Sequence, residues 1–557
     1  MSAYAGTARQ NLPTVLLLAL LSLVILALVV APLFAILYRA FVDVQDGTLH
    51  LTDRHIVEVL TTDIYWHAFG NTLLVSCGAA VIATVLGTFF AWVFVRTNTV
   101  GRAVLEQISQ LPIFIPPFVG AVAWVLLAAP RVGILNRMLM ELSIPGGLDV
   151  YTHGGMLSVI GLYLAPYVMM IVAGSLRSMD PSLEEAAQVA GLTKMQTALR
   201  ITGPVLAPAI LSGAVLAFTI AIGLFGTPVV LGWSRQILLL TSRIWISAQE
   251  VPPDYGVMAV LSIYLLLLSS IAALIQRALL KDRNYVTITG KGFRPRLVEL
   301  GGWGWLSLAI AIFYVFFTIV APIAVLIAAA LSQYTWSADF SFDNFVQAIS
   351  SDDVWFTMQN SVIISIVSAT IATVLGICIS WIAIRTRLPG RHVLEHLILL
   401  PISIPGIAFG VGVMLVWIGA PVTVYGTAII IVFAFVGRFT AYAVRSISSS
   451  LVQVHPELEE SARIIGYGPL LTFARITLPL ILPSILAGWL LLFSFFMTEL
   501  SMVVILYTAA SRTFSVLSFE VWNVGDFSKL ASYSLLQMAI GVLFMTLLKL
   551  FFGSKTS

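Results

Sequence analysis

Charged side chains are scarce in this chain. They make up 10% of its 557 residues, whereas hydrophobic residues make up 59%. An ordinary soluble protein has about 25% charged residues, so the composition excludes a soluble domain. Cysteine is also rare. Cys77 and Cys378 both lie within long apolar runs, and we expect them to pack against neighbours rather than form a disulfide or a metal site.

Motifs for catalytic chemistry are missing as well. No Gly-x-x-x-x-Gly-Lys-Ser/Thr sequence occurs, so the chain is not expected to bind or hydrolyse ATP. Its seven histidines are scattered, and His50, His55 and His67 fall in or near one polar loop, where we expect them to be solvated rather than metal ligands. No nucleophile lies in an arrangement with a base. The sequence therefore predicts no enzyme and no resident metal.

Apolar runs long enough to cross a bilayer, about 20 residues each, are what the chain has in abundance. Twelve such runs cover residues 14–40, 69–95, 106–129, 155–176, 205–232, 257–280, 303–331, 360–384, 394–418, 421–446, 477–508 and 530–553. The first is longer than a typical signal sequence and lacks a clear cleavage site, so it is interpreted as a retained span. The predicted fold class is an all-α integral membrane protein with about twelve transmembrane helices.

Charge is distributed unequally between alternate loops. One set is acidic and holds Asp43, Asp46, Asp53, Glu58 and Asp63, and, in the second half, Asp339, Asp343, Asp352 and Asp353. The other set is basic and holds Arg96, Arg102, Arg177, Lys194, Arg200, Arg277, Lys281, Arg283, Lys291, Arg294 and Arg296. Cytoplasmic loops carry the excess of Lys and Arg, so the basic loops and both termini are predicted to be cytoplasmic. Basic stretches beside apolar spans indicate orientation rather than nucleic-acid binding.

The chain contains an internal repeat. Residues 71–97 align with 360–386 at a spacing of 289 residues, and Ile-Ala-Thr-Val-Leu-Gly occurs identically in both. A second repeat, Glu185–Gly191 and Glu460–Gly466, has a spacing of 275, so the first half carries 14 extra residues, placed around 130–154. An even number of spans per half makes the halves parallel. We predict two six-helix units, 1–280 and 299–557, joined by a cytoplasmic linker, 281–298.

The second repeat predicts a short polar helix in each half. Asp180 can cap it, Pro181 suits its first position, and the acids that follow complement the helix dipole. Gly191 and Gly466 permit the turn that ends it. The small side chains of Ala186, Ala187 and Ala462 leave a slim helix face that a partner can approach closely. A second short helix is expected around 194–201 and 469–476. The alternative interpretation is a helix pair that merely lies on the membrane surface.

The repeated motif follows a fixed pattern: Glu-Ala-Ala, three residues, Gly, nine residues, Ile and, shortly after, Pro. This pattern resembles the cytoplasmic loop of permeases of binding-protein-dependent ATP-binding-cassette importers. In that family the loop forms a coupling helix seated in a groove of the ATPase subunit. The resemblance implies coupling roles for Glu184, Glu185, Ala186, Ala187, Gly191, Ile201 and Pro204, and for Glu459, Glu460, Ala462, Gly466, Ile476 and Pro479. The chain departs from the pattern at Ser461, which replaces an alanine, and at Gly203, which replaces a leucine.

The resemblance covers nearly the whole chain, as two fused permease units of a type I importer. It implies two copies of an ATPase subunit, which would bind ATP and Mg²⁺, a periplasmic or lipid-anchored binding protein, surrounding membrane lipid and a bacterial inner-membrane location. An extra first span in each half and the runs 115–124 and 130–136 look like the permeases of ferric-iron importers. Related fused permeases handle thiamine, phosphonates and sugar phosphates.

Two ionisable residues interrupt predicted spans. Arg438 and Glu499 have Tyr163 and Leu224 as first-half counterparts. Such residues mark transport pathways, or form a buried ion pair between helices, or extend to the interface. Gly226, Thr227 and Pro228 break the fifth span, and Ser501 lies at the corresponding break. These breaks line a pathway or are plain kinks.

Two rival classes share part of this pattern. A secondary transporter driven by an ion gradient has the same repeat, but it leaves the repeated polar loop unexplained and needs coupling acids that the spans largely lack. An integral-membrane enzyme needs a cluster of catalytic groups near one face of the membrane.

Overall fold

A computed structural model describes residues 2–45, 48–180, 182–280, 297–333 and 339–553. Within them the chain is helical almost throughout, with one antiparallel hairpin of β1 (Val42–Gln45) and β2 (Thr48–Leu51). The predicted linker 281–298 lies outside the described residues up to position 296.

Nine of the described helices are long and apolar enough to cross a membrane. In the first half they are α1 (Ser2–Ile25) continued through η1 (Leu26–Val30) into α2 (Ala31–Phe41), α4 (Asp63–Arg96), α8 (His153–Ser178), η3 (Ala198–Thr202) with α11 (Gly203–Gly223), and α14 (Tyr255–Leu280). In the second half they are α15 (Trp303–Val315), η5 (Phe316–Val320) and α16 (Ala321–Ala330) in one run, α18 (Asp352–Arg385), α21 (Ala428–Gln453), and η7 (Phe473–Thr477) with α24 (Leu478–Thr498). The last helix is α27 (Phe527–Gly553).

Two predicted spans are sharply bent. The first consists of α5 (Arg102–Ile108), η2 (Leu111–Phe114) and α6 (Pro117–Ala128), bent by 100°. The second consists of α19 (Arg391–Leu399), η6 (Leu400–Ser403) and α20 (Gly406–Trp417), bent by 117°. Counting each bent pair as one gives up to eleven candidate spans among the described residues, against the twelve predicted. The cause is local: Ile115 and Ile404 precede prolines and are extended, as that position requires.

Two further spans end earlier than predicted. The run 205–232 divides after Gly223 into α11 and the short α12 (Gly226–Gly232). The run 477–508 divides after Thr498 into α24 and α25 (Val503–Leu506). Both breaks leave backbone groups that require partners inside the protein.

Prolines also shape the unbroken spans. Each of the π-helical turns η1, η3, η5 and η7 is followed by a helix with proline at its second position: Pro32, Pro204, Pro322 and Pro479. Proline donates no hydrogen bond and its ring displaces the carbonyl four residues earlier. A wider turn at that point accommodates the ring without ending the helix.

The first span of each half packs on the other half. An ideal Cβ on Gly412 of α20 would lie 2.6 Å from the Pro32 carbonyl oxygen, and one on Gly437 of α21 would lie 2.4 Å from that of Leu28. In the opposite direction, Tyr314 of α15 donates a hydrogen bond to the Leu162 carbonyl of α8 at 3.0 Å. The two units are therefore interlocked, and one buried core runs through both.

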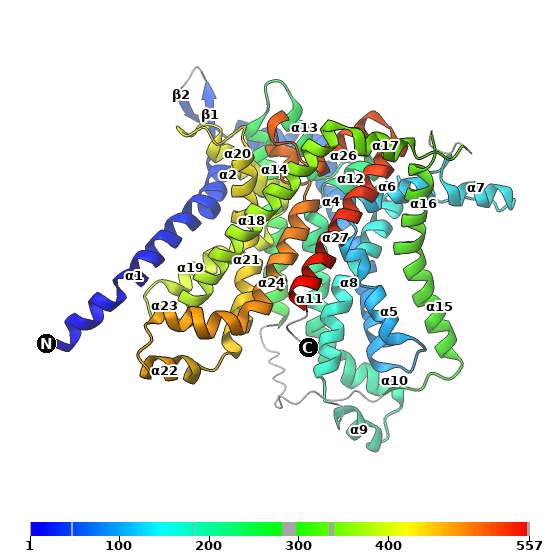
Figure 1. Ribbon diagram of the computed structural model, residues 1–557. Helices are drawn as coiled ribbons and strands as arrows, with labels where there is room; N and C mark the ends of the chain where they lie inside the picture. The colour runs from blue at the N-terminus through cyan, green and yellow to red at the C-terminus, as the bar shows by residue number, and fades with distance from the viewer. Residues whose placement is uncertain (1, 46–47, 181, 281–296, 334–338, 554–557) are drawn as a thin grey trace.

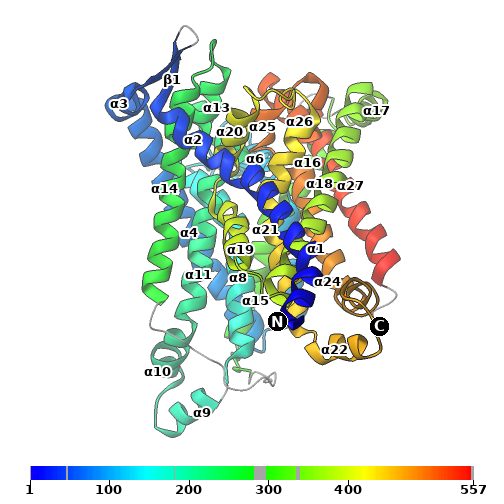
Figure 2. The ribbon, with the colours of Figure 1, turned by 90° about the vertical axis from the view of Figure 1, so that its left-hand side faces the viewer.

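The two ends of the helix bundle differ. In Figures 1 and 2, α9 (Ser182–Val189) and α22 (Pro456–Ile464) project from one end, toward which α1 begins and α27 ends. The hairpin, α7 (Ile134–Glu141), α13 (Leu240–Gln249), α17 (Asp343–Ser350) and α26 (Phe514–Val524) lie at the opposite end. We call these the motif end and the outer end. The repeated motifs and the acidic loops are thus separated, as the charge pattern predicted.

Gly437→Ala places a methyl group where the Leu28 carbonyl now lies. We expect it to destabilise the protein by about 1–3 kcal/mol, because the first span must move away. The measurement is the melting temperature of the purified full chain. Gly174→Ala, on α8 with open space around its Cα, is the control; equal melting temperatures for both variants would contradict this packing.

Candidate functional site

The two repeated motifs have the same local shape. Each polar helix ends at a glycine of positive φ, +88° for Gly191 and +97° for Gly466. The next amide closes the turn: Leu192 donates to the Ala187 carbonyl at 3.1 Å, and Tyr467 donates to the Ala462 carbonyl at 3.0 Å. This is the Schellman arrangement, which requires a left-handed residue at that position. The short helices α10 (Lys194–Thr197) and α23 (Pro469–Thr472) then return the chain to the bundle.

A charged cluster fastens the second motif to the membrane helices. Arg385, at the end of α18, places its Nε 2.9 Å from Glu459 Oε1. Thr477 donates its hydroxyl hydrogen to the same carboxylate oxygen at 2.8 Å. The guanidinium also donates to the carbonyls of Leu451 and Val454 at 3.0 and 2.8 Å. The motif helix, the end of α18 and the start of the fifth span are thereby joined.

The first motif repeats this cluster. Arg96, at the end of α4, lies 3.3 Å from Glu184 Oε2, and the Thr202 hydroxyl donates to Glu184 Oε1 at 2.7 Å. We call Arg96, Glu184 and Thr202, and Arg385, Glu459 and Thr477, the anchoring triads. The first triad is looser, because the Arg96 Nε and one terminal nitrogen find no hydrogen-bond partner among the described residues.

The triads determine which of the predicted coupling residues point into the bundle and which are exposed. Glu184 and Glu459 bind their own bundle. Ala187 and Ala462 are buried, so of the three alanines expected to form a slim outward face, Ala186, Ala187 and Ala462, these two do not contribute to it. Glu185, Ala186 and Glu460 are exposed, as are Pro204 and Pro479, while Ile201 and Ile476 are half-buried.

Sequence reasoning missed the arginines and threonines of the triads. A signal was present, because Arg-Ile-Thr occurs at both 200–202 and 475–477, and Arg96 and Arg385 are equivalent in the repeat. What it could not show is that a span-ending arginine and a motif acid, 88 residues apart in the first half, meet in space.

The motif helices present apolar side chains to the outside. Leu183 and Leu458 occupy equivalent positions and are 47% and 48% exposed. Val189 and Ile464, also equivalent, are 89% and 86% exposed. Matching apolar surface on two helices of a polar end is typical of a protein interface.

Three of the predicted pathway residues converge on Gly406. An ideal Cβ there would lie 3.0 Å from Arg438 Nη1, 3.3 Å from Glu499 Oε1 and 3.3 Å from Ser501 Cβ. Arg438 and Glu499 form no ion pair within the described part of the chain. Arg438 Nε instead donates to the Ile404 carbonyl at 3.2 Å, and Glu499 Oε1 accepts the Met502 amide at 3.0 Å. Each charge thus satisfies a backbone group that a helix break has freed.

The breaks of the two halves meet. Ideal Cβ atoms on Gly223 and Gly226 would lie 3.4 Å from Pro405 Cα and 3.1 Å from a methyl carbon of Leu500. Buried Thr227 donates its hydroxyl hydrogen to the Pro117 carbonyl at 2.8 Å, and Pro228 beside it is buried too. Four helix breaks are therefore gathered at the contact between the units.

Tyr163, the counterpart of Arg438, makes a different contact. Its ring packs against Gly120 of α6, 2.8 Å from an ideal Cβ at that glycine. At the contact between the units, the charged side chains Arg438 and Glu499 therefore both come from the second half.

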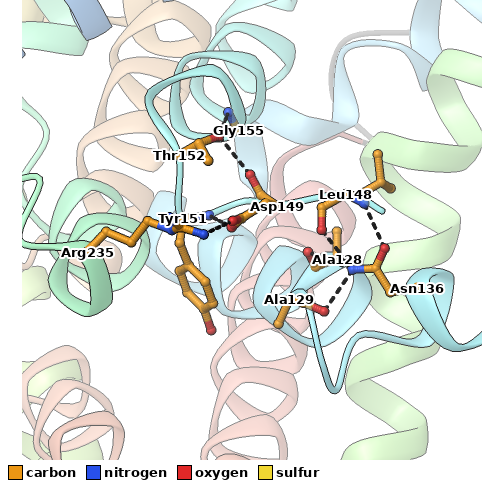
Figure 3. Close-up of polar contacts among 9 residues, drawn as sticks. All are labelled: Ala128, Ala129, Asn136, Leu148, Asp149, Tyr151, Thr152, Gly155 and Arg235. Atoms are coloured by element: carbon orange, nitrogen blue, oxygen red, sulfur yellow. Dashed lines mark hydrogen bonds and ion pairs between the residues drawn. The ribbon is translucent and has the colours of Figure 1, made fainter. Parts of the chain in front are cut away.

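Side-chain bonds cross-link the predicted insertion at the outer end (Figure 3). The Asn136 carboxamide accepts the Leu148 amide at 2.7 Å and donates to the carbonyls of Ala129 and Leu148 at 2.9 and 2.8 Å. Asp149 accepts the Tyr151 amide at 2.9 Å and forms an ion pair with Arg235. The Asn136 bonds close the loop on itself, and the Arg235 ion pair joins it to η4 (Trp233–Arg235), the short helix that follows α12.

An open cavity of about 170 Å³ lies beside this loop, between the two halves. Its lining includes Tyr151, Trp233, Trp522 and Phe527. Burial, and after it the Asp149 carboxylate, raise the pKa of Tyr151. Its hydroxyl therefore stays protonated at neutral pH and is able to donate a hydrogen bond.

Glu459→Ala leaves the Arg385 charge buried without its carboxylate, which costs about 3–5 kcal/mol for a buried pair. We expect faster amide hydrogen exchange across 455–477 and a lower melting temperature. Glu460→Ala, the exposed neighbour on α22, should change neither.

The two triads should differ in strength. Because Arg385 has more hydrogen-bond partners than Arg96, Arg385→Ala should lower the melting temperature more than Arg96→Ala. The reverse order would contradict the conclusion that the first triad is looser.

Comparison with known proteins agrees with this geometry. Residues 83–285 and 372–554 each match the family described as binding-protein-dependent transport system inner membrane component. Over 499 residues the chain is 27% identical to the putative ferric transport system permease protein FbpB 1 of Haemophilus influenzae, covering 89% of this chain and 78% of that protein. It is 27% identical over 539 residues to the ferric transport system permease protein FbpB of Actinobacillus pleuropneumoniae, covering 92% and 75%.

A shorter relative matches less than half of the chain. The sulfate transport system permease protein CysT of Salmonella typhimurium is 28% identical over 225 residues, covering 40% of this chain and 80% of its own length. Because the family matches both halves and together more than half of the sequence, the chain belongs to the inner membrane components of binding-protein-dependent transport systems, as an ABC importer permease with two units fused in one polypeptide.

Proposed function

We propose that the chain forms the membrane pathway of an ATP-driven importer for ferric iron. The observation that supports ferric iron as the substrate is the similarity to two ferric transport permeases. The two matches cover 89% and 92% of this chain. Both fused units take part in that match, so the likeness extends to the contact between them, where a substrate would cross.

Two copies of an ATPase subunit would dock at the motif end. Its surface offers equivalent features to each copy: Leu183 or Leu458, Val189 or Ile464, and the acids Glu185 or Glu460. Covering the exposed apolar side chains would supply binding energy, and the acids would select a basic partner surface. ATP and Mg²⁺ would be held by those subunits, and the motif end and both termini would be cytoplasmic.

A periplasmic or lipid-anchored binding protein would deliver substrate at the outer end. The acidic loops, the ordered insertion and the cavity between the halves lie there, and their position opposite the motif helices suits delivery from the other side of the membrane.

Transport would follow from the rigidity of the triads. When the ATPases close, α9 and α22 are drawn together, and the ends of α4 and α18 move with them through Arg96 and Arg385. The two units then rotate about their interlocked first spans. That motion opens or closes the gathered breaks around Gly406, which is alternating access driven by the binding energy of a partner.

The coupling role is tested with the double variant Glu185→Ala/Glu460→Ala. The permease is reconstituted with the ATPase and binding protein from its genomic neighbourhood, and iron-stimulated ATP hydrolysis is measured. We expect at least about a tenfold loss, since a charge-assisted hydrogen bond contributes about 1.5–3 kcal/mol. Glu457→Ala, an exposed acid outside the motif, should retain full stimulation.

Other results of this experiment would redirect the proposal. Uptake that follows an ion gradient with no associated ATPase would remove the importer mechanism. ATP hydrolysis that couples normally but ignores iron would move the substrate to the phosphonates, sugar phosphates or thiamine.

The pathway role is tested with Glu499→Gln. The glutamine oxygen still accepts the Met502 amide, so the break stays capped and only the charge is removed. We expect iron uptake into proteoliposomes to fall at least about tenfold, equivalent to about 1.4 kcal/mol, with an unchanged melting temperature. Unchanged uptake would assign Glu499 to capping alone.

A further inference from the structure

His55 is buried at the outer end, against the sequence prediction that it is solvated. It lies on α3 (Arg54–Thr61) and is 5% exposed, while His50 and His67 are exposed as expected. Its ring packs on Gly256 at the start of α14, where an ideal Cβ would lie 2.3 Å from the ring. Only glycine leaves room for the imidazole there.

Neither ring nitrogen of His55 has a hydrogen-bond partner among the described residues. A buried imidazole normally makes at least one such bond, because leaving a buried polar group unsatisfied costs about 1–3 kcal/mol. The ring is therefore missing a partner that the described residues do not provide.

Three carboxylates surround the ring. Asp254 Oδ1 lies 3.7 Å from Nδ1, and Asp43 Oδ1 lies 3.9 Å from Nε2. Glu58 follows His55 by three residues on α3, which places both on one face of the helix. One ligand atom each from His55, Glu58 and Asp254 lie within 4.8 Å of one another.

Arg39 balances part of this negative charge. Arg39 lies 3.5 Å from Asp43 and stands over the ring of Tyr255 at 5.9 Å. The Val257 amide donates to Asp254 Oδ1 at 2.9 Å, which orients that carboxylate at the start of α14. A cation beside His55 would balance the remaining carboxylates.

We propose that His55, Glu58 and Asp254 form a binding site for a divalent transition-metal ion, with Asp43 as an adjacent carboxylate. One imidazole nitrogen with carboxylate oxygens is a donor set suited to Zn²⁺, Fe²⁺ or Mn²⁺. Ligands bound at about 2.0–2.2 Å in a tetrahedron are about 3.3–3.6 Å apart, so rotation of the carboxylate side chains closes the site. A water molecule would complete the coordination.

The ion would join segments that are distant in sequence. It would tie α3 to the first turn of α14, with β1 alongside through Asp43, and so stabilise the outer end of the first unit. This inference does not depend on the transported substrate, because the site lies away from the helix breaks around Gly406.

The test uses the purified full chain in lipid nanodiscs, stripped with EDTA and equilibrated with Zn²⁺, Fe²⁺ or Mn²⁺ in separate samples. Bound metal is counted by mass spectrometry of the elements, and the dissociation constant is measured by calorimetry. We expect one ion per chain for at least one metal, and slower amide exchange in α3 when it is bound.

Variants that preserve shape identify the ligands. Asp254→Asn retains the acceptor for the Val257 amide and Glu58→Gln retains side-chain size; each should weaken binding by more than about 100-fold, beyond the effect of losing a supporting group. His50→Gln, an exposed histidine of the same segment, should bind as wild type. Binding that survives both acid variants overturns the site, and so does a wild-type chain that takes up none of the three metals.

Discussion

The buried pairing of a span-ending arginine with a motif acid is the interaction on which the rest of the architecture depends. Arg385 and Glu459, and their equivalents Arg96 and Glu184, hold a polar helix rigidly to a bundle that is otherwise apolar. In the proposed mechanism, that bond passes the movement of each motif to the spans. The threonine at the start of the fifth span adds a second attachment, so a motif acid is bonded to two spans.

Helix breaks give the bundle its other essential property. Prolines bend the third span of each half, and the fifth span of each half stops early. These four breaks meet where the halves touch, and Thr227, Arg438 and Glu499 each bond a backbone group beside one of them. The proposed pathway passes through this contact between the halves.

The two halves have diverged in what they carry. The first has the insertion held by Asn136 and Asp149 and the acid cluster around His55, both at the outer end. The second has the central charges and the more fully bonded arginine. Interlocked first spans join the halves despite this divergence, because the first span of each unit packs against helices of the other.

Patterns along the sequence predicted much of the fold of this protein. Apolar length predicted the helices, loop charge predicted which segments share an end, and the repeat predicted paired units and paired motifs with their glycine turns. Each of these follows from the order of residues along the chain and requires no knowledge of which distant segments meet in space.

Only the tertiary structure decided what those features touch. Glu184 and Glu459 looked like partner-facing acids, yet each turns inward to an arginine on another span. The sequence left open whether Arg438 and Glu499 line a pathway, pair with each other or extend to the interface, and in the structure each bonds freed backbone instead of the other. His55 looked solvated, yet Gly256 and three carboxylates enclose it. Burial and pairing depend on which distant segments approach one another, and neither hydrophobic length nor charge order in a single chain specifies that approach.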